Sequence, residues 1–241
     1  MNPLPLVYLG PSLPLTRAKA VLDADYRPPV KRGDLPQRHD GTIVIIDGEF
    51  GQNLSVSPKE ILRLLDRGTR VIGASSMGAL RATELSVYGM QGCGWVFEAY
   101  ESGRVDADDE VAVAYSPDDL SCLTVPLVNV RHWLDVLLTA GAIDAVTARR
   151  LLKGARQLFY ADRSEERLLT KWDAILPSSE IQQLLLSTGG RISDIKAADA
   201  EQALASVRRP LQANPQEDDD GSQQTAESEG NRGAWASIGR R

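Results

Sequence analysis

Short apolar runs alternate with helix-like segments in the N-terminal part of the chain. Apolar residues 6–9 precede a helical pattern at 15–22, residues 42–46 precede one at 58–67, and residues 70–72 precede one at 77–88. Strands that alternate with helices at this spacing are typical of β-α-β units. We therefore predict an α/β fold with a small parallel sheet.

Each predicted strand runs into small or polar residues. Right-handed crossovers place the carboxyl ends of these strands at one edge of the sheet, where ligands of open α/β proteins bind. Candidate substrate-binding residues at this edge are Ser12, Asp47 and Glu49. The alternative for the two acidic residues is a role in turns and caps.

The pattern changes further along the chain. Residues 89–94 are expected to form a glycine-rich break, and residues 111–115 a further strand. From residue 125 onward, apolar residues recur at three-to-four spacing, and after Pro210 the chain becomes polar and acidic. We predict an α/β domain over residues 1–124, a helical lobe over 125–210 and a disordered tail over 211–241.

Bulk properties exclude several classes of function. The 241 residues carry a net charge of −6, which disfavours a nucleic-acid partner. No apolar run approaches a membrane span, and the N-terminus lacks the basic region of a signal peptide. Cys93 and Cys122 fit no metal-ligand pattern, and no phosphate-loop motif occurs. We expect no metal, no cofactor and no membrane, and a cytoplasmic location.

The segment 71–84 combines an apolar strand, small residues, two serines and a helix start. It nearly matches the nucleophile-elbow pattern G-x-S-x-G centred on Ser76, with Ala74 in place of the first glycine and Gly78 as the second. Ser76 or Ser75 is therefore a candidate nucleophile, and the amides of Met77 and Gly78 are candidate oxyanion donors. The alternative is that one of the serines only caps the helix.

A lysine is predicted at the same edge. Ser57 and Glu60 form a capping box with Pro58 at the first helical position, which places Lys59 in the first turn. The helix dipole disfavours a cation there, which suits a general base. The alternative is an exposed surface lysine.

Other polar residues offer weaker candidates. Arg81 lies about one helical turn after Ser76, where it would contact a substrate carboxylate or pair with Glu84. The acidic run at 106–110 is expected to be a solvated loop. Of the two histidines, His39 is expected in a solvated loop and His132 in a structural role, so a Ser-His-Asp triad is not favoured.

A set of short motifs occurs in a fixed order and resembles the TfuA-like family, closely over residues 6–115 and more loosely through 159–163. The motifs are Leu9-Gly10-Pro11-Ser12-Leu13, Ala24-Asp25-Tyr26-Arg27-Pro28-Pro29, Arg32-Gly33-Asp34, Ile45-Ile46-Asp47-Gly48, Lys59-Glu60-Ile61-Leu62, residues 73–84, Phe97-Glu98-Ala99-Tyr100 and Asp108-Asp109-Glu110-Val111-Ala112.

The resemblance implies a partner of YcaO enzymes, which convert backbone amides of a precursor peptide to thioamides. It implies hydrolysis of the C-terminal thiocarboxylate of a ubiquitin-like sulfur-carrier protein, which releases sulfide, by a serine–lysine pair. Ser76, or Ser75, and Lys59 are the positions that fit this pair. Two alternatives are a non-catalytic adaptor that recruits a YcaO enzyme and a small-molecule hydrolase unrelated to sulfur transfer.

Overall fold

The computed structural model describes residues 3–51 and 55–208. Residues 1–209 form one unit of the fold and residues 210–241 a second. The predicted disordered tail, including Trp235, lies outside the described residues. The boundary predicted between the α/β domain and the helical lobe falls inside the first unit and stays a prediction.

The core of the protein is a five-stranded, all-parallel sheet with the strand order β2-β1-β3-β4-β5. The strands are β1 (Leu6–Tyr8), β2 (Asp25–Arg27), β3 (Thr42–Ile45), β4 (Arg70–Ala74) and β5 (Gln91–Cys93). Helices alternate with these strands, so the predicted α/β fold is confirmed. The strand order reverses between β1 and β3, and this reversal marks the place where doubly wound sheets bind their ligands.

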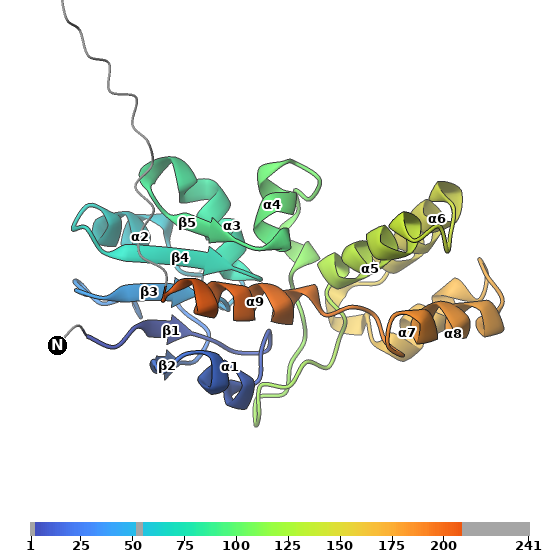
Figure 1. The fold of residues 1–241 in the computed structure, drawn as a ribbon, viewed down its shortest axis with the longest axis horizontal. Helices are drawn as coiled ribbons and strands as arrows, with labels where there is room; N and C mark the ends of the chain where they lie inside the picture. The colour runs from blue at the N-terminus through green and yellow to red at the C-terminus, as the bar shows by residue number, and fades with distance from the viewer. Residues whose placement is uncertain (1–2, 52–54, 209–241) are drawn as a thin grey trace, which may run out of the picture. The chain divides into compact units, whose positions relative to one another are not determined.

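Helices cover both faces of the sheet (Figure 1). They are α1 (Leu15–Val21), α2 (Pro58–Leu65), α3 (Met77–Leu85), α4 (Trp95–Glu101) and α9 (Ile195–Ser206). On one face, Ile43 and Val71 pack with α2 and α3. On the other, Val44 and Ile72 pack with α1 and α9. Neighbouring strand residues thus point to opposite faces and both are buried, as expected for a covered parallel sheet.

The capping box predicted at the start of α2 is present. The Ser57 hydroxyl accepts a hydrogen bond from the Lys59 amide at 3.3 Å, and the Glu60 carboxylate accepts one from the Ser57 amide at 2.9 Å. Pro58 takes the first helical position. Local chemistry therefore determines where this helix begins.

Four helices form a lobe beyond the carboxyl ends of the strands (Figure 1). They are α5 (Leu127–Thr139), α6 (Ala145–Arg156), α7 (Glu165–Trp172) and α8 (Ser178–Ser187). Their core contains the stacked rings of Trp133 and Trp172, whose centroids are 5.6 Å apart. The indole N–H of Trp133 donates to the Thr188 hydroxyl, and that of Trp172 to the Leu151 carbonyl. The last helix, α9, leaves this lobe and packs on the sheet.

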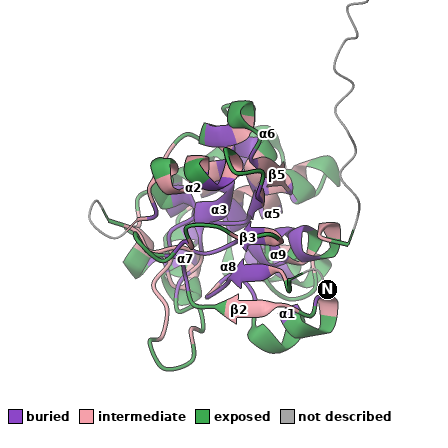
Figure 2. Ribbon diagram, turned by 90° about the vertical axis from the view of Figure 1, so that its left-hand side faces the viewer, coloured by how far each residue is buried: buried purple, intermediate pink, exposed green. Residues whose placement is uncertain are grey.

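Figure 2 shows which residues this arrangement of helices and strands buries. The helix α3 is buried along most of its length, whereas the edge strand β2 is partly exposed. Three 3-10 helices complete the described elements of the fold: η1 (Ser86–Tyr88), η2 (Asp108–Glu110) and η3 (Tyr160–Asp162). A buried α3 means that the residues preceding it are held rigidly.

Two short stretches differ from the sequence prediction. Residues 111–115 form no strand, and only an isolated bridge joins Tyr115 to Cys122. The expected glycine-rich break contains β5 instead. A Cβ atom on Gly92 would lie 2.2 Å from the Phe97 ring, so the glycine lets this ring pack against the strand. The strand is too short for its alternation to be read from the sequence.

Candidate active site

The reversal point of the sheet is held by a buried carboxylate. Asp47, which is 2% exposed, follows β3 and accepts three hydrogen bonds from the loop after β1. The amides of Gly10 and Ser12 donate to Oδ2 at 2.9 and 3.1 Å, and the Ser12 hydroxyl donates to Oδ1 at 2.6 Å. The predicted convergence of Ser12 and Asp47 at the carboxyl edge is therefore present. In this structure Asp47 holds the loop in place.

A strained serine lies at the end of β4. Ser75 has a φ of 68°, which is rare for a residue with a side chain. The Ser76 amide donates back to the Ala74 carbonyl at 2.7 Å, so the three residues form a tight turn. Such a conformation costs on the order of 1–2 kcal/mol and is found most often at functional sites. Ser75 is fully buried, and its hydroxyl has no hydrogen-bond partner in the described structure.

Ser76 occupies the position immediately before α3. Its side chain makes no capping hydrogen bond, although it stands at the capping position. It is 3% exposed. Neither serine hydroxyl therefore caps the start of α3 in the described structure.

Two glycines bring this turn close to the sheet. A Cβ atom on Gly73 would lie 2.1 Å from the Gly78 carbonyl oxygen, and one on Gly78 would lie 1.7 Å from the Ile45 carbonyl oxygen. Only glycine permits this approach of α3 to β3 and β4. Of the two predicted oxyanion donors, the Gly78 amide is already used, because it donates to the Ile46 carbonyl at 3.2 Å. The Met77 amide has no partner among the described residues.

The predicted lysine forms no hydrogen bond with either serine in the described structure. Lys59 is exposed at the start of α2, where it lines a shallow surface cavity with Arg32 and Glu60. Neither Ser75 nor Ser76 lines that cavity. The capping box fixes the start of α2, but burial of the serine turn separates the two groups. The pairing of Lys59 with a serine stays a prediction.

Arg81 is largely engaged within the protein. Its Nε donates to the Val56 carbonyl at 3.0 Å, and its Nη1 donates to the Glu84 carboxylate at 2.8 Å. This is the intrahelical pairing that the spacing allowed. Arg81 also lines a cavity of about 360 Å³ beside Met77 and Ser57, on the α2–α3 side of the edge. A ligand in that cavity would lie beside the first turn of α3.

A connecting segment crosses the carboxyl edge. We name residues 114–124 the strap. The Tyr115 hydroxyl donates to the Glu49 carboxylate at 2.7 Å, and the Cys122 thiol donates to the Pro11 carbonyl at 3.3 Å. Burial and the bond to Glu49 raise the pKa of Tyr115 to about 12. The strap thus joins the loops after β1 and β3, and Glu49 serves to hold it.

Sequence reasoning missed Lys196, in the first turn of α9. This lysine is 2% exposed, and its ammonium donates to the Val111 carbonyl at 2.8 Å. It lines a cavity of about 390 Å³ with Ser12 and Asn129, on the α5–α9 side of the edge. The local sequence around Lys196 does not distinguish it from the exposed lysines. Its burial depends on the helical lobe, which lies between β5 and α9 along the chain.

The remaining nucleophile and base candidates are poorly suited to catalysis. Desolvation raises the pKa of the Cys122 thiol to about 11, so it stays protonated near neutral pH. His132 contacts the Ser193 hydroxyl at 2.8 Å and packs against Trp95, and burial lowers its pKa. Its structural role is as expected.

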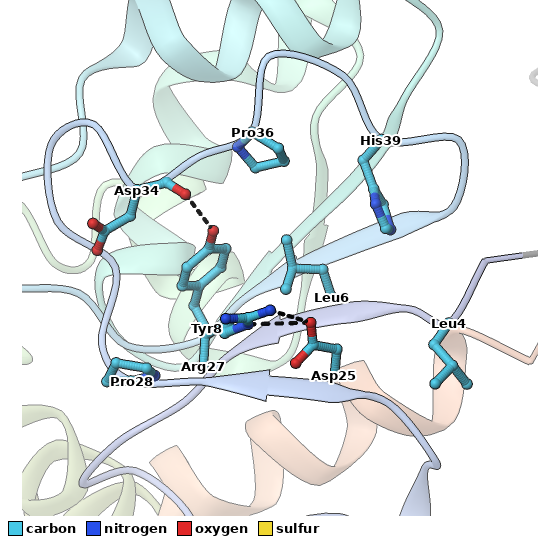
Figure 3. A pocket seen from close by; sticks show the side chains of 9 residues that line it. All are labelled: Leu4, Leu6, Tyr8, Asp25, Arg27, Pro28, Asp34, Pro36 and His39. Carbon is cyan, nitrogen blue, oxygen red and sulfur yellow. Dashed lines mark hydrogen bonds and ion pairs between the residues drawn. The ribbon is translucent and has the colours of Figure 1, made fainter.

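Another cavity, of about 910 Å³, lies away from the serine turn. It covers the face of β1 and β2 where the connection from β2 to β3 carries no helix (Figure 3). His39 lies in a loop, as expected, but it lines this cavity and is half-buried rather than fully solvated. The Tyr8 hydroxyl donates to the Asp34 carbonyl, and Arg27 pairs with Asp25. These two contacts pair Tyr8, Arg27 and Asp25, whereas Nε2 of His39 is buried and has no hydrogen-bond partner in the described structure.

Other site classes find no support in the described residues. There, no group of three His, Cys, Asp or Glu side chains is arranged to hold a metal ion. None of the helices within residues 3–51 and 55–208 is long and apolar enough to cross a membrane.

The fold and the site define a doubly wound, parallel α/β protein with a strained serine turn at the ligand-binding edge of its sheet. Residues 47–164 match the family model of the TfuA-like proteins, so the predicted resemblance to this family is confirmed. The family is associated with YcaO-type modification. A search of the curated proteins finds no match to this chain.

Proposed function

We propose that the protein is a YcaO partner in peptide backbone thioamidation. In this role it hydrolyses the C-terminal thiocarboxylate of a ubiquitin-like sulfur-carrier protein and releases sulfide for its partner, which engages the precursor peptide. The observation that carries the proposal is the strained, buried Ser75, whose hydroxyl has no partner at the edge where such sheets bind ligands.

The nucleophile is Ser75 or Ser76. The first glycine of the elbow pattern is Gly73 when the pattern is centred on Ser75, and the positive φ of Ser75 is the backbone strain of a nucleophile elbow. Centring on Ser76 places Gly78 at the second glycine instead. The strain favours Ser75, whereas the small residual exposure of Ser76 favours that residue for access.

The chemical step balances without a cofactor. A base takes the serine proton while the serine oxygen attacks the thiocarboxylate carbon. The C–S bond then breaks, sulfur leaves as hydrosulfide with the proton returned by the base, and an acyl-serine remains. Water hydrolyses this ester, which regenerates the serine and leaves a carboxylate on the carrier. The Met77 amide is the donor available to the developing oxyanion.

The base in this proposal is Lys59, as the sequence predicted. Its amine lines the cavity next to the one that reaches Met77, and Ser57 and Arg32 line both cavities. Because both serines are enclosed, the substrate tail reaches them only after a covering segment moves. The strap is the segment suited to this movement, since side chains rather than a regular sheet hold it.

A second function is a non-catalytic adaptor that recruits or activates the YcaO enzyme. It is favoured by one observation: the two serines are buried, and no lysine amine bonds to them in the described structure. In this function the serine turn would serve only to pack α3 against the sheet.

Sulfide release from a thiocarboxylated carrier protein separates these functions. The full chain is mixed with the carrier, with and without the YcaO enzyme, and sulfide is measured for wild type and for Ser75→Ala, Ser76→Ala and Lys59→Ala. Loss by more than about a hundredfold in one serine variant and in Lys59→Ala supports the hydrolase. The double variant should then be little worse than either single variant.

The controls use exposed residues away from the edge. Lys153→Ala on α6 should keep the wild-type rate. Wild-type rates in both serine variants would defeat the hydrolase and leave the adaptor. Turnover of simple esters without any carrier would instead indicate a small-molecule hydrolase. Loss in Ser75→Ala but not in Ser76→Ala would assign the nucleophile.

A further inference from the structure

The cavity on the α5–α9 side of the sheet edge contains a buried lysine. Lys196 is 2% exposed and forms no ion pair within the described part of the chain. The Val111 carbonyl accepts one hydrogen bond from its ammonium, which has three donors. A buried charge is costly unless it is paired, so this ammonium suits an anionic partner.

Hydrogen bonds between the residues that line this cavity hold the backbone of Lys196 in place. Asn129, itself buried, accepts a hydrogen bond from the Lys196 amide at 3.3 Å and donates one to Asp194 at 3.1 Å. Ser12 borders the cavity from the loop after β1, and its hydroxyl is already bonded to Asp47. The backbone of Lys196 is therefore held in place in a cavity that the loop after β1 also borders.

Charges of both signs surround the mouth of the cavity. Glu165, Asp194 and Arg191 line its exposed side, so the charges near the surface largely offset one another, and Lys196 is the charged group at its buried end. The rest of the lining mixes polar residues such as Thr124 with apolar ones such as Leu123 and Ile192. Polar groups can bond to backbone amides and apolar ones can contact side chains, so a buried lysine within such walls fits a peptide that ends in a carboxylate.

We propose that Lys196 anchors the C-terminal carboxylate, or thiocarboxylate, of an extended polypeptide tail in this cavity. The inference rests on the proposed function for the identity of the tail, because a sulfur carrier presents such an end. Ser75, Ser76 and Lys59 do not line this cavity, so Lys196 holds the end of the tail as it docks, and the end leaves Lys196 before the serine attacks. The strap borders the same cavity through Cys122 and Leu123, so a bound tail lies beneath it.

A direct binding measurement tests the anchor without any turnover. The full chain is titrated by calorimetry with the peptide acetyl-Ala-Ala-Ala-Ala-Gly-Gly carrying a free carboxylate, and with the same peptide as a C-terminal amide. The amide should bind at least about tenfold more weakly, because it removes a charge-assisted bond to a buried ammonium. Inorganic phosphate is tested separately as a competitor.

The matched variants are Lys196→Met and Lys153→Met. Methionine is an unbranched, uncharged side chain only one heavy atom shorter than lysine, and removing an unpaired buried charge should leave the melting temperature unchanged or raise it. The acid peptide should raise the melting temperature of wild type and of Lys153→Met, but not that of Lys196→Met. The tenfold preference for the acid should also disappear in Lys196→Met alone.

Several outcomes overturn the anchor. They are equal binding of acid and amide by wild type, no binding of the acid peptide, a preference that persists in Lys196→Met, and displacement of the peptide by equimolar phosphate. The first and second need no variant, so a Lys196→Met protein that fails to fold leaves the test decisive. Acid-specific binding without sulfide release would keep the anchor and defeat the hydrolase. Sulfide release without acid-specific binding would keep the hydrolase and overturn the anchor.

Discussion

The carboxylate of Asp47 accepts hydrogen bonds from both the amide and the hydroxyl of Ser12, at 3.1 and 2.6 Å. Asp47 follows β3 and Ser12 follows β1, so this contact joins the two strands between which the sheet order reverses. It fixes the shape of the edge where we place the substrate. The cavity that contains Lys196 shares Ser12 as a wall.

Removing the Asp47 carboxylate should therefore destabilise the protein. Asp47→Ala leaves three buried donors without an acceptor and should lower the free energy of unfolding by about 3 kcal/mol, whereas Ser12→Ala should cost about 1 kcal/mol. Urea denaturation measures both. Asp40→Ala breaks only an exposed pair with Arg38 and should stay within about 0.5 kcal/mol of wild type. A similarly small effect of Asp47→Ala would show that the carboxylate does not hold the edge.

The strain at Ser75 predicts a trade-off between stability and activity. Glycine adopts a positive φ without steric cost, so Ser75→Gly should be neutral or stabilising by up to about 1 kcal/mol. Ser75→Ala keeps the strain and should not be stabilising. If Ser75 is the nucleophile, both variants lose sulfide release. Denaturation midpoints and sulfide assays on the same preparations measure the two effects, and a Ser75→Gly protein clearly less stable than Ser75→Ala would contradict the strain argument.

A buried ion pair connects the acidic run to the helical lobe. Glu110 is fully buried and accepts two hydrogen bonds from Arg131, at 2.7 and 2.6 Å. Glu110→Ala leaves Arg131 without its partner and should cost about 3–5 kcal/mol. Its exposed neighbour Asp109 is the matched control, and Asp109→Ala should change stability by less than about 0.5 kcal/mol. Equal changes in the melting temperatures of the two variants would refute this prediction.

Asp199 predicts a specific pH dependence of stability. Burial raises its pKa to about 6, although the amides of Val96 and Trp95 donate to its carboxylate and act in the opposite direction. The raised pKa lies above the unfolded value of about 3.9, so the folded state binds more protons between these pH values. The contribution of Asp199 to stability therefore falls as the pH rises from about 4 to about 6.

The variant Asp199→Asn removes this contribution. Its stability should rise more steeply with pH between about 4 and 6 than that of wild type, as followed by melting temperature. Asp144 caps α6, and the hydrogen bond that it accepts from the Thr147 amide lowers the pKa of its carboxyl. Asp144→Asn should therefore change the dependence of stability on pH in the opposite sense, and at lower pH. Parallel profiles for wild type and Asp199→Asn would count against the raised pKa.

The predictable parts of this protein are those that neighbouring residues determine. The alternation of apolar runs predicted β1, β3 and β4 with the helices after them, and Ser57 and Glu60 determined the start of α2. The serine turn was visible because small residues follow an apolar strand. Periodicity and capping act over a few residues along the chain, so they can be read without knowing the fold.

Tertiary structure decided which side chains are buried and which of them meet. The acidic run contains the buried Glu110, against the expectation of a solvated loop, because Arg131 arrives from α5 to pair with it. Lys59 stays exposed while Lys196 is enclosed, although both lie in first helical turns. Burial of a charge depends on partners distant in sequence, and local pattern carries no information about them. The sequence by itself thus determined the elements and the chemistry available at the sheet edge, and long-range packing decided which lysine is buried there.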